Sequence, residues 1–215
     1  MPSTPRRADA DPPDLAQLAA RAGQLGQTGG RRLIGITGPP GAGKSTLAAA
    51  LAGALDAVVV LMDGFHLADT QLRELNRLER KGAPDTFDGV GYVALLRELR
   101  AAATVRAPDF DRDREETVPE SIQVASTAQF VITEGNYLLL EDEPWRQIRG
   151  LLDAIWYIDH PQRIERLVAR FVGYGWERAA AQARATVGSD AANARLIAAS
   201  RHRADLVLDH GWLTG

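Results

Sequence analysis

Cysteine is absent from the sequence of 215 residues, which excludes disulfide bonds, thiolate metal sites and a cysteine nucleophile. No run of about 18 apolar residues occurs, so the sequence predicts no membrane-spanning helix. An excess of positive charge is also lacking, because 25 Lys and Arg residues face 28 Asp and Glu residues, for a net charge of −3. We therefore expect neither a nucleic-acid partner nor a membrane partner. The lack of cysteine fits a cytoplasmic protein.

The remaining composition is that of an ordinary globular protein, with 45% hydrophobic and 25% charged residues. Residues 1–14 are rich in Pro, Arg and Asp and contain no apolar stretch, so they are interpreted as a flexible leader rather than a secretory signal. The length suits one domain with a sizeable core. We expect a single domain over residues 1–215.

Short apolar runs alternate with stretches of helical periodicity along the chain. The apolar runs predict buried strands at 32–37, 57–62, 129–133, 153–158 and 204–208. The periodic stretches predict helices at 14–25, 45–55, 69–79, 92–102, 161–172, 177–186 and 190–200. This alternation predicts an α/β fold in which a mostly parallel five-stranded sheet is flanked by helices, a three-layer sandwich.

A phosphate-binding loop follows the first predicted strand and opens a predicted helix. Its pattern is G-x-x-x-x-G-K-S, in which glycines let backbone N–H groups converge on an anion and the helix N-terminus adds positive potential. The lysine is expected at the β- and γ-phosphates and the serine hydroxyl at Mg²⁺. The predicted nucleotide-binding residues are Gly38, Pro39, Pro40, Gly41, Ala42, Gly43, Lys44, Ser45 and Thr46.

A nucleoside triphosphate site fits a switch GTPase, a motor ATPase or a small-molecule kinase. The guanine-reading pattern Asn-Lys-x-Asp is absent, and Asp88-Gly-Val-Gly91 matches D-x-x-G only within a polar loop. The kinase has positive support, because Asp63 and Glu134 each end a predicted parallel strand, and ligands bind beyond the carboxyl ends of such strands. Phosphoryl transfer needs one carboxylate to accept the proton of the acceptor hydroxyl and another to hold the metal shell.

Three segments make the kinase hypothesis more specific. They are Met62-Asp63-Gly64-Phe65-His66-Leu67, Arg80-Lys-Gly-Ala-Pro-Asp-Thr-Phe-Asp88 and Thr133-Glu134-Gly135-Asn136-Tyr137. Together with the phosphate-binding loop they resemble the P-loop kinase family of type I pantothenate kinase, uridine kinase and phosphoribulokinase. The likeness is strongest to nucleoside/nucleotide kinase-like proteins, some provisionally named fructose transport system kinases. The resemblance spans about residues 32–209 and implies a P-loop NTPase fold with a helical lid.

The resemblance also implies roles for individual residues. Asp63 matches the catalytic aspartate, with a share in metal binding, and Glu134 matches the acidic residue that holds Mg²⁺ together with Ser45. Residues 107–112 resemble a substrate segment, although Phe110 and Arg112 depart from the tyrosine and histidine of pantothenate kinase, so pantothenate is not the expected acceptor. The expected substrate-binding residues are His66, Phe110, Arg112, Asn136 and Tyr137, with Phe87 as a further wall.

A lid is predicted at 161–200. Arg163, Arg166 and Arg170 share one stripe of a helix whose opposite stripe is apolar, and Gly173-Tyr-Gly175 supplies a break after it. In the resembled family this region is a lid whose arginines contact the phosphates, and Arg166 and Arg170 are the expected catalytic pair. Ser189-Asp190-x-x-Asn193 resembles a further family element and also fits a helix N-cap.

The sequence therefore predicts Mg²⁺-dependent phosphoryl transfer from ATP to a hydroxyl of a small metabolite. The choice of ATP follows from the resemblance, and so does the option of a homodimer. A nucleoside monophosphate kinase and a regulatory ATPase acting through a protein partner stay as alternatives. The residues do not specify which sugar, nucleoside or pantothenate-like molecule is the acceptor.

Overall fold

The computed structural model describes residues 13–25, 30–101, 104–111, 114 and 116–209. The expected leader, residues 1–14, lies outside this part of the chain except for its last two residues. Its final residue, Asp14, forms a capping box with Gln17 that starts helix α1 (Leu15–Gly23). Within the described residues no helix has the length and apolarity needed to cross a membrane.

Five parallel strands form the central sheet, in the order β2-β5-β1-β6-β7. Their bounds are β1 (Arg32–Thr37), β2 (Val58–Leu61), β5 (Phe130–Glu134), β6 (Ala154–Ile158) and β7 (Leu206–Leu208). All five coincide with the predicted apolar runs. Glu134 at the end of β5 lies opposite Ile36 of β1 and Leu61 of β2. The segments that follow these three strands therefore leave the sheet at the same edge.

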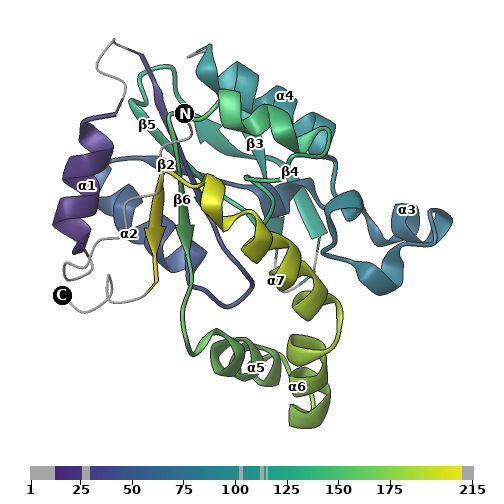
Figure 1. Ribbon diagram of the computed structural model, residues 1–215. Helices are drawn as coiled ribbons and strands as arrows, with labels where there is room; N and C mark the ends of the chain where they lie inside the picture. Colours follow the sequence, from purple (N-terminus) through teal and green to yellow (C-terminus); the bar gives the residue numbers. More distant parts are fainter. Residues whose placement is uncertain (1–12, 26–29, 102–103, 112–113, 115, 210–215) are drawn as a thin grey trace.

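Helices cover both faces of the sheet, which confirms the predicted three layers (Figure 1). On one face, α1 and α2 (Lys44–Leu55) bury Leu18, Leu47 and Leu51 against alternate residues of β1, β5 and β6. On the other face, α4 (Gly89–Arg100) and a 3₁₀ helix at Trp145–Gly150 pack with Tyr92, Leu96 and Trp145 into the larger core. Unbroken apolar strands suit a sheet that is covered on both sides.

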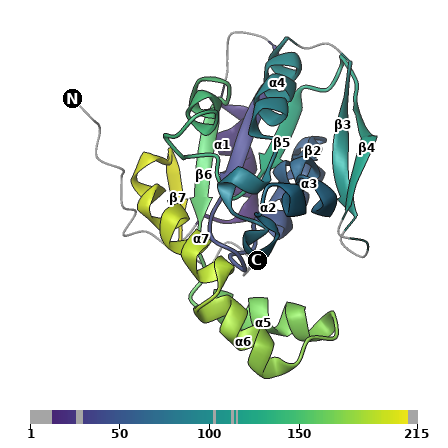
Figure 2. The same cartoon turned by 90° about the vertical axis from the view of Figure 1, so that its right-hand side faces the viewer.

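A β-hairpin that the sequence analysis did not predict stands beside the sheet (Figure 2). Its antiparallel strands are β3 (Val105–Asp111) and β4 (Glu116–Val124). The predicted helix at 69–79 is also shorter than expected, since α3 (Asp69–Glu74) is followed by a separate 3₁₀ turn at Leu78–Arg80. Both elements border the edge at which β2 ends.

The predicted lid segment forms α5 (Arg163–Gly173), α6 (Arg178–Thr186) and α7 (Ser189–Ala199). Helices α5 and α6 share a small core of their own, in which Leu167, Val168 and Phe171 pack against Ala181 and Ala185. In both ribbon views α5 and α6 project beyond the sheet on the side where β6 ends, while α7 runs back toward the body. The lid is thus a two-helix arm above the carboxyl edge of the strands.

Candidate active site

A cleft of about 490 Å³ lies between the carboxyl edge of the sheet and the lid. Most of the predicted site residues line it. From the phosphate-binding loop and its helix these are Pro40, Gly41, Gly43, Lys44, Ser45 and Thr46; from β5 and the segments after β2 and β5, Asp63, His66, Glu134 and Asn136; from the loop before α4 and the hairpin, Phe87 and Phe110; and from the lid, Arg166 and Arg170.

The phosphate-binding loop joins β1 to α2 through glycines in conformations that other residues rarely adopt. Gly43, the N-cap of α2, has a φ of 99°. Lys44 Nζ donates to the carbonyls of Gly38 at 2.9 Å and Pro39 at 3.3 Å, which ties the ammonium to the loop it follows. The loop therefore presents backbone N–H groups, a helix N-terminus and a lysine at one place, the arrangement that binds a polyphosphate.

Ser45 and Glu134 form the part of the cleft best suited to a metal. The Ser45 hydroxyl donates to Glu134 Oε1 at 2.7 Å, and Glu134 is only 4% exposed. A hydroxyl and a carboxylate are hard oxygen ligands of the kind that Mg²⁺ takes. Among the described residues no cluster of three or more His, Cys, Asp or Glu side chains could hold a metal ion alone. The residues fit a Mg²⁺ ion that completes its shell with phosphate oxygens and water.

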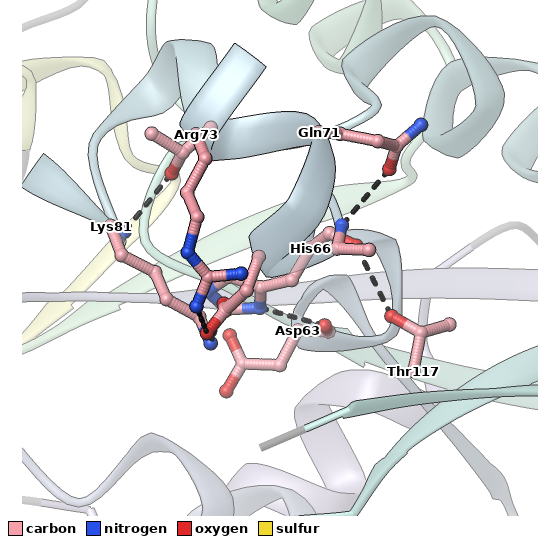
Figure 3. A network of polar contacts seen from close by, with 10 residues as sticks. Asp63, His66, Gln71, Arg73, Lys81 and Thr117 are labelled. Atoms are coloured by element: carbon pink, nitrogen blue, oxygen red, sulfur yellow. Dashed lines mark hydrogen bonds and ion pairs between the residues drawn. The ribbon is translucent and has the colours of Figure 1, made fainter. Parts of the chain in front are cut away.

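Asp63 lies in a 3₁₀ turn (Met62–Phe65) directly after β2, half-buried at the cleft. His66 fixes this turn, since its Nδ1 lies 2.8 Å from the Asp63 carbonyl oxygen and its own carbonyl accepts from Thr117 Oγ1 of β4 (Figure 3). A carbonyl oxygen only accepts, so Nδ1 carries the proton in this geometry. The turn thus sets Asp63 and His66 side by side.

Close approach of the hairpin explains the glycine in Asp63-Gly64-Phe65-His66. A Cβ on Gly64 would lie 2.6 Å from the Pro108 carbonyl oxygen of β3. This contact brings Phe110 next to His66, with 4.8 Å between ring centroids, while Phe87 lies on His66 at 4.0 Å. The three rings form an aromatic wall beside Asp63.

Two lid arginines have buried guanidinium nitrogens. Nη1 of Arg166 and Nη1 of Arg163 have no hydrogen-bond partner within the described part of the chain. Buried N–H donors are almost always paired in folded proteins. Arg166 lines the cleft, so its buried Nη1 marks a place where an anionic ligand oxygen would satisfy it, which agrees with a bound phosphate.

Tyr137 does not reach the cleft, contrary to the expectation that it binds substrate. It is fully buried, packs on Phe87 and Trp145, and donates its hydroxyl to the Gly82 carbonyl. Burial, followed by the nearby carboxylates of Asp190 and Asp63, raises the pKa of Tyr137 far above its usual value. Tyr137 therefore packs behind Phe87 and supports the aromatic wall without lining the cleft. Arg112, the other expected substrate residue, lies outside the described residues.

The cleft is also lined by residues that sequence reasoning did not choose for the site. They are Lys81 and Gly82 of the loop before Phe87, Leu167 and Phe171 of α5 with Tyr174 after it, Arg184 of α6, and Asp190 and Asn193 of α7. One signal in the sequence could have pointed to the first. The chain has two lysines against 23 arginines, and both lysines line this one cleft.

Comparison with known proteins shows the family of the chain. The model of the phosphoribulokinase/uridine kinase family matches residues 33–172, and the chain belongs to this family. The Escherichia coli protein YggC, which is uncharacterised, is 33% identical over 188 residues, covering 83% of this chain and 78% of YggC. A Schizosaccharomyces pombe protein provisionally named uridine kinase is 35% identical over 176 residues, which cover 74% of this chain and 73% of the S. pombe protein.

A solved structure is also similar throughout. The crystal structure of a protein from Silicibacter sp. TM1040, provisionally named fructose transport system kinase, matches with a TM-score of 0.81 and 40% identity. The match covers 91% of this chain and 98% of that chain. The fold class expected from the sequence, an α/β P-loop kinase fold, is thereby confirmed.

Proposed function

We propose that the protein is a Mg²⁺-dependent kinase that transfers the γ-phosphoryl group of ATP to a hydroxyl of a small metabolite. The observation that carries this proposal is that Asp63, Glu134 and the phosphate-binding loop line one cleft of about 490 Å³, together with the aromatic side chains Phe87 and Phe110 that flank His66. A site for nucleotide phosphates alone would not need a carboxylate and an aromatic wall beyond the phosphate-binding loop. Membership of a kinase family supports the same interpretation.

Each residue has a role in the proposed reaction. Bound Mg²⁺-ATP supplies the phosphoryl group and neutralises part of its charge. Lys44 and the loop N–H groups hold the phosphates, and Ser45 with Glu134 orients the metal. Arg166 and Arg170 extend from the lid and offset charge that develops on the transferred group. Asp63 orients the acceptor hydroxyl in line with the γ-phosphorus and accepts its proton.

A panel of metabolites tests the proposal. Purified protein is incubated with Mg²⁺ and ATP or GTP together with sugars, nucleosides, hydroxy acids or nucleoside monophosphates, and products are read by mass spectrometry. We expect one hydroxyl compound to gain a phosphoryl group with stoichiometric release of nucleoside diphosphate. Hydrolysis of ATP at the same rate with and without every acceptor would instead indicate a regulatory ATPase. If a phosphoryl group were transferred only to the phosphate of nucleoside monophosphates, the protein would instead be a nucleoside monophosphate kinase.

ATP use and the cysteine-free sequence support a cytoplasmic location for this reaction. The partner in the proposed reaction is the small-molecule acceptor, and the reaction requires neither a nucleic acid nor a membrane.

A further inference from the structure

We propose that the acceptor carries a carboxylate or phosphate group besides its reacting hydroxyl, and that Lys81 and Arg184 bind this anionic group. The inference rests on the proposed function, because it concerns the part of the same cleft that would hold the acceptor. It divides the cleft's cations into two sets: Lys44, Arg166 and Arg170 serve the nucleotide, and Lys81 with Arg184 serves the acceptor.

Lys81 is placed on the acceptor side by its loop. This loop pairs with the Asp63–His66 turn, because Leu67 N donates to Thr86 O and Asp88 N donates to Phe65 O. The Lys81 side chain is 17% exposed, and its Nζ donates to Asp69 Oδ1 at 2.8 Å at the rim. Figure 3 shows Lys81 extending toward the side of the cleft where the Asp63 carboxylate lies. An ammonium with three donors suits a ligand anion there.

Gly82, next to Lys81, is fixed by two donors from distant elements. Its carbonyl accepts from the Tyr137 hydroxyl and from Asn193 Nδ2 at 3.0 Å, and its N–H donates to Thr86 Oγ1 at 3.0 Å. Both Tyr137 and Asn193 are buried. Such a network rigidifies the backbone next to Lys81. It also gives Tyr137 a positioning role.

Arg184 is oriented as firmly from the lid. Its Nε lies 3.2 Å from Asp190 Oδ2, and its guanidinium lies 5.1 Å from the centroid of Phe171 and 5.2 Å from that of Trp176. A guanidinium held by a carboxylate and two ring faces is preorganised for a forked contact with a carboxylate or phosphate.

The first turn of α7 holds both cations at once. Asp190 binds Arg184, and Asn193, three residues later and so on the same helix face, binds the loop that carries Lys81. Lys81 and Arg184 are therefore both tied, directly or through Gly82, to the N-terminal part of α7, and both line the cleft. This shared anchor is why we assign the two cations to one anionic group.

Matched pairs of acceptors test the inference: glycerate against glycerol, pantothenate against panthenol, and glucose 6-phosphate against glucose. We expect the anionic member of a pair to be phosphorylated with a kcat/KM at least tenfold higher than its neutral counterpart, or to be the only member phosphorylated. A preference in the first two pairs indicates recognition of a carboxylate, and a preference in the third indicates recognition of a phosphate. In Lys81→Gln and Arg184→Gln the acceptor KM should rise about 10- to 100-fold, as expected when a charged hydrogen bond is lost, with the KM for ATP unchanged. Arg178→Gln, on the exposed start of α6, is the matched control and should behave as the parent protein.

Lysine modification gives a readout that needs no turnover, because the only side-chain amines are Lys44 and Lys81. With reductive methylation followed by mass spectrometry, Mg²⁺-ATP should protect Lys44, and an anionic acceptor should protect Lys81. Equal or better use of the neutral partners, or an unchanged preference in Lys81→Gln, would overturn the inference while leaving the kinase intact. Protection of Lys81 by anions without any phosphorylation would retain the anion site and overturn the proposed function. If anions neither protected Lys81 nor were preferred as acceptors, the inference would be overturned.

Discussion

The Ser45 hydroxyl donates a 2.7 Å hydrogen bond to Glu134 Oε1, joining the first turn of α2 to the last residue of β5. The two residues are far apart in sequence and meet because β1 and β5 end at the same edge of the sheet. A hydroxyl and a carboxylate at this distance can share one cation. Under the proposed function, the pair would hold Mg²⁺ beside the phosphate-binding loop.

Replacing Glu134 by Gln keeps the side-chain shape and removes its charge. We expect phosphoryl transfer to fall by about 10²–10³-fold, the range seen when one electrostatic contact to the transition state is lost, and the Mg²⁺ concentration for half-maximal activity to rise. The melting temperature without nucleotide should not fall, because a buried charge is removed. Glu98→Gln, on the exposed face of α4, is the control; normal Mg²⁺ dependence in Glu134→Gln would remove Glu134 from the metal site.

Asp63→Asn tests the proposed base. Turnover should fall by about 10²–10⁴-fold, the usual contribution of general base catalysis, while ATP binding, measured by calorimetry, stays unchanged. Asp56→Asn is a suitable control, since Asp56 is exposed and has a φ of 51°, a conformation that asparagine tolerates well. Retained turnover in Asp63→Asn would assign the catalysis to positioning and electrostatics alone.

Two glycine substitutions should have opposite effects on stability. A Cβ on Gly64 would meet the Pro108 carbonyl oxygen at 2.6 Å, so Gly64→Ala should displace the hairpin and destabilise the protein by about 1–3 kcal/mol. The acceptor KM should rise with it, because Phe110 moves away from His66. Gly53 lies within α2, where a Cβ would extend into open space. Gly53→Ala should therefore stabilise the protein by about 0.5–1 kcal/mol. Chemical denaturation measures both.

Tyr157 predicts a change of stability with pH. It is fully buried in β6, and burial raises its pKa to about 12. The unfolded state loses this proton near pH 10, so the stability present below pH 10 declines as pH rises from about 10 to 12, by up to about 1.4 kcal/mol per unit. In Tyr157→Phe the free energy of unfolding, measured by chemical denaturation at each pH, should fall less between about pH 10 and pH 12 than in the parent protein.

At neutral pH the same variant should be as stable as the parent or more so. The Tyr157 hydroxyl is buried with no hydrogen-bond partner among the described residues, and an unsatisfied buried hydroxyl is unfavourable. A clear loss of stability in Tyr157→Phe at neutral pH would show that the hydroxyl is paired in solution.

The strands could be predicted because each is an apolar run with no polar alternation, as in Val58–Leu61, which only a sheet buried on both faces tolerates. The hairpin could not. Pro108 and Pro119 interrupt its two strands, β4 is mostly exposed, and the hairpin packs against the Asp63–His66 turn, which is distant in sequence. Contacts between residues so distant in the sequence cannot be inferred from the local pattern of residues.

In the site, the motif residues were predictable because their spacing and their places at strand ends carry the chemistry. Tyr137 shows the limit of that reasoning, since a tyrosine beside Asn136 fits a pocket wall or a buried support equally well, and only packing on Trp145 decides. Arg184 and Asn193 reach the cleft through the path of α6 and α7, which sequence periodicity does not fix. Asp88-Gly-Val-Gly91, dismissed as a GTPase pattern, is an N-cap, with Asp88 Oδ1 accepting from Gly91 N at 2.8 Å.

The joint between Gly41 and α5 links the phosphate-binding loop to the base of the arm. A Cβ on Gly41 would lie 2.2 Å from the Arg163 carbonyl oxygen, so the first turn of the arm rests on bare main chain with no compliant side chain in between. A displacement of the loop at Gly41 would therefore have to be accompanied by a displacement of the base of the arm. Under the proposed function, we expect nucleotide binding at the loop and the position of the arm arginines to be coupled through this joint.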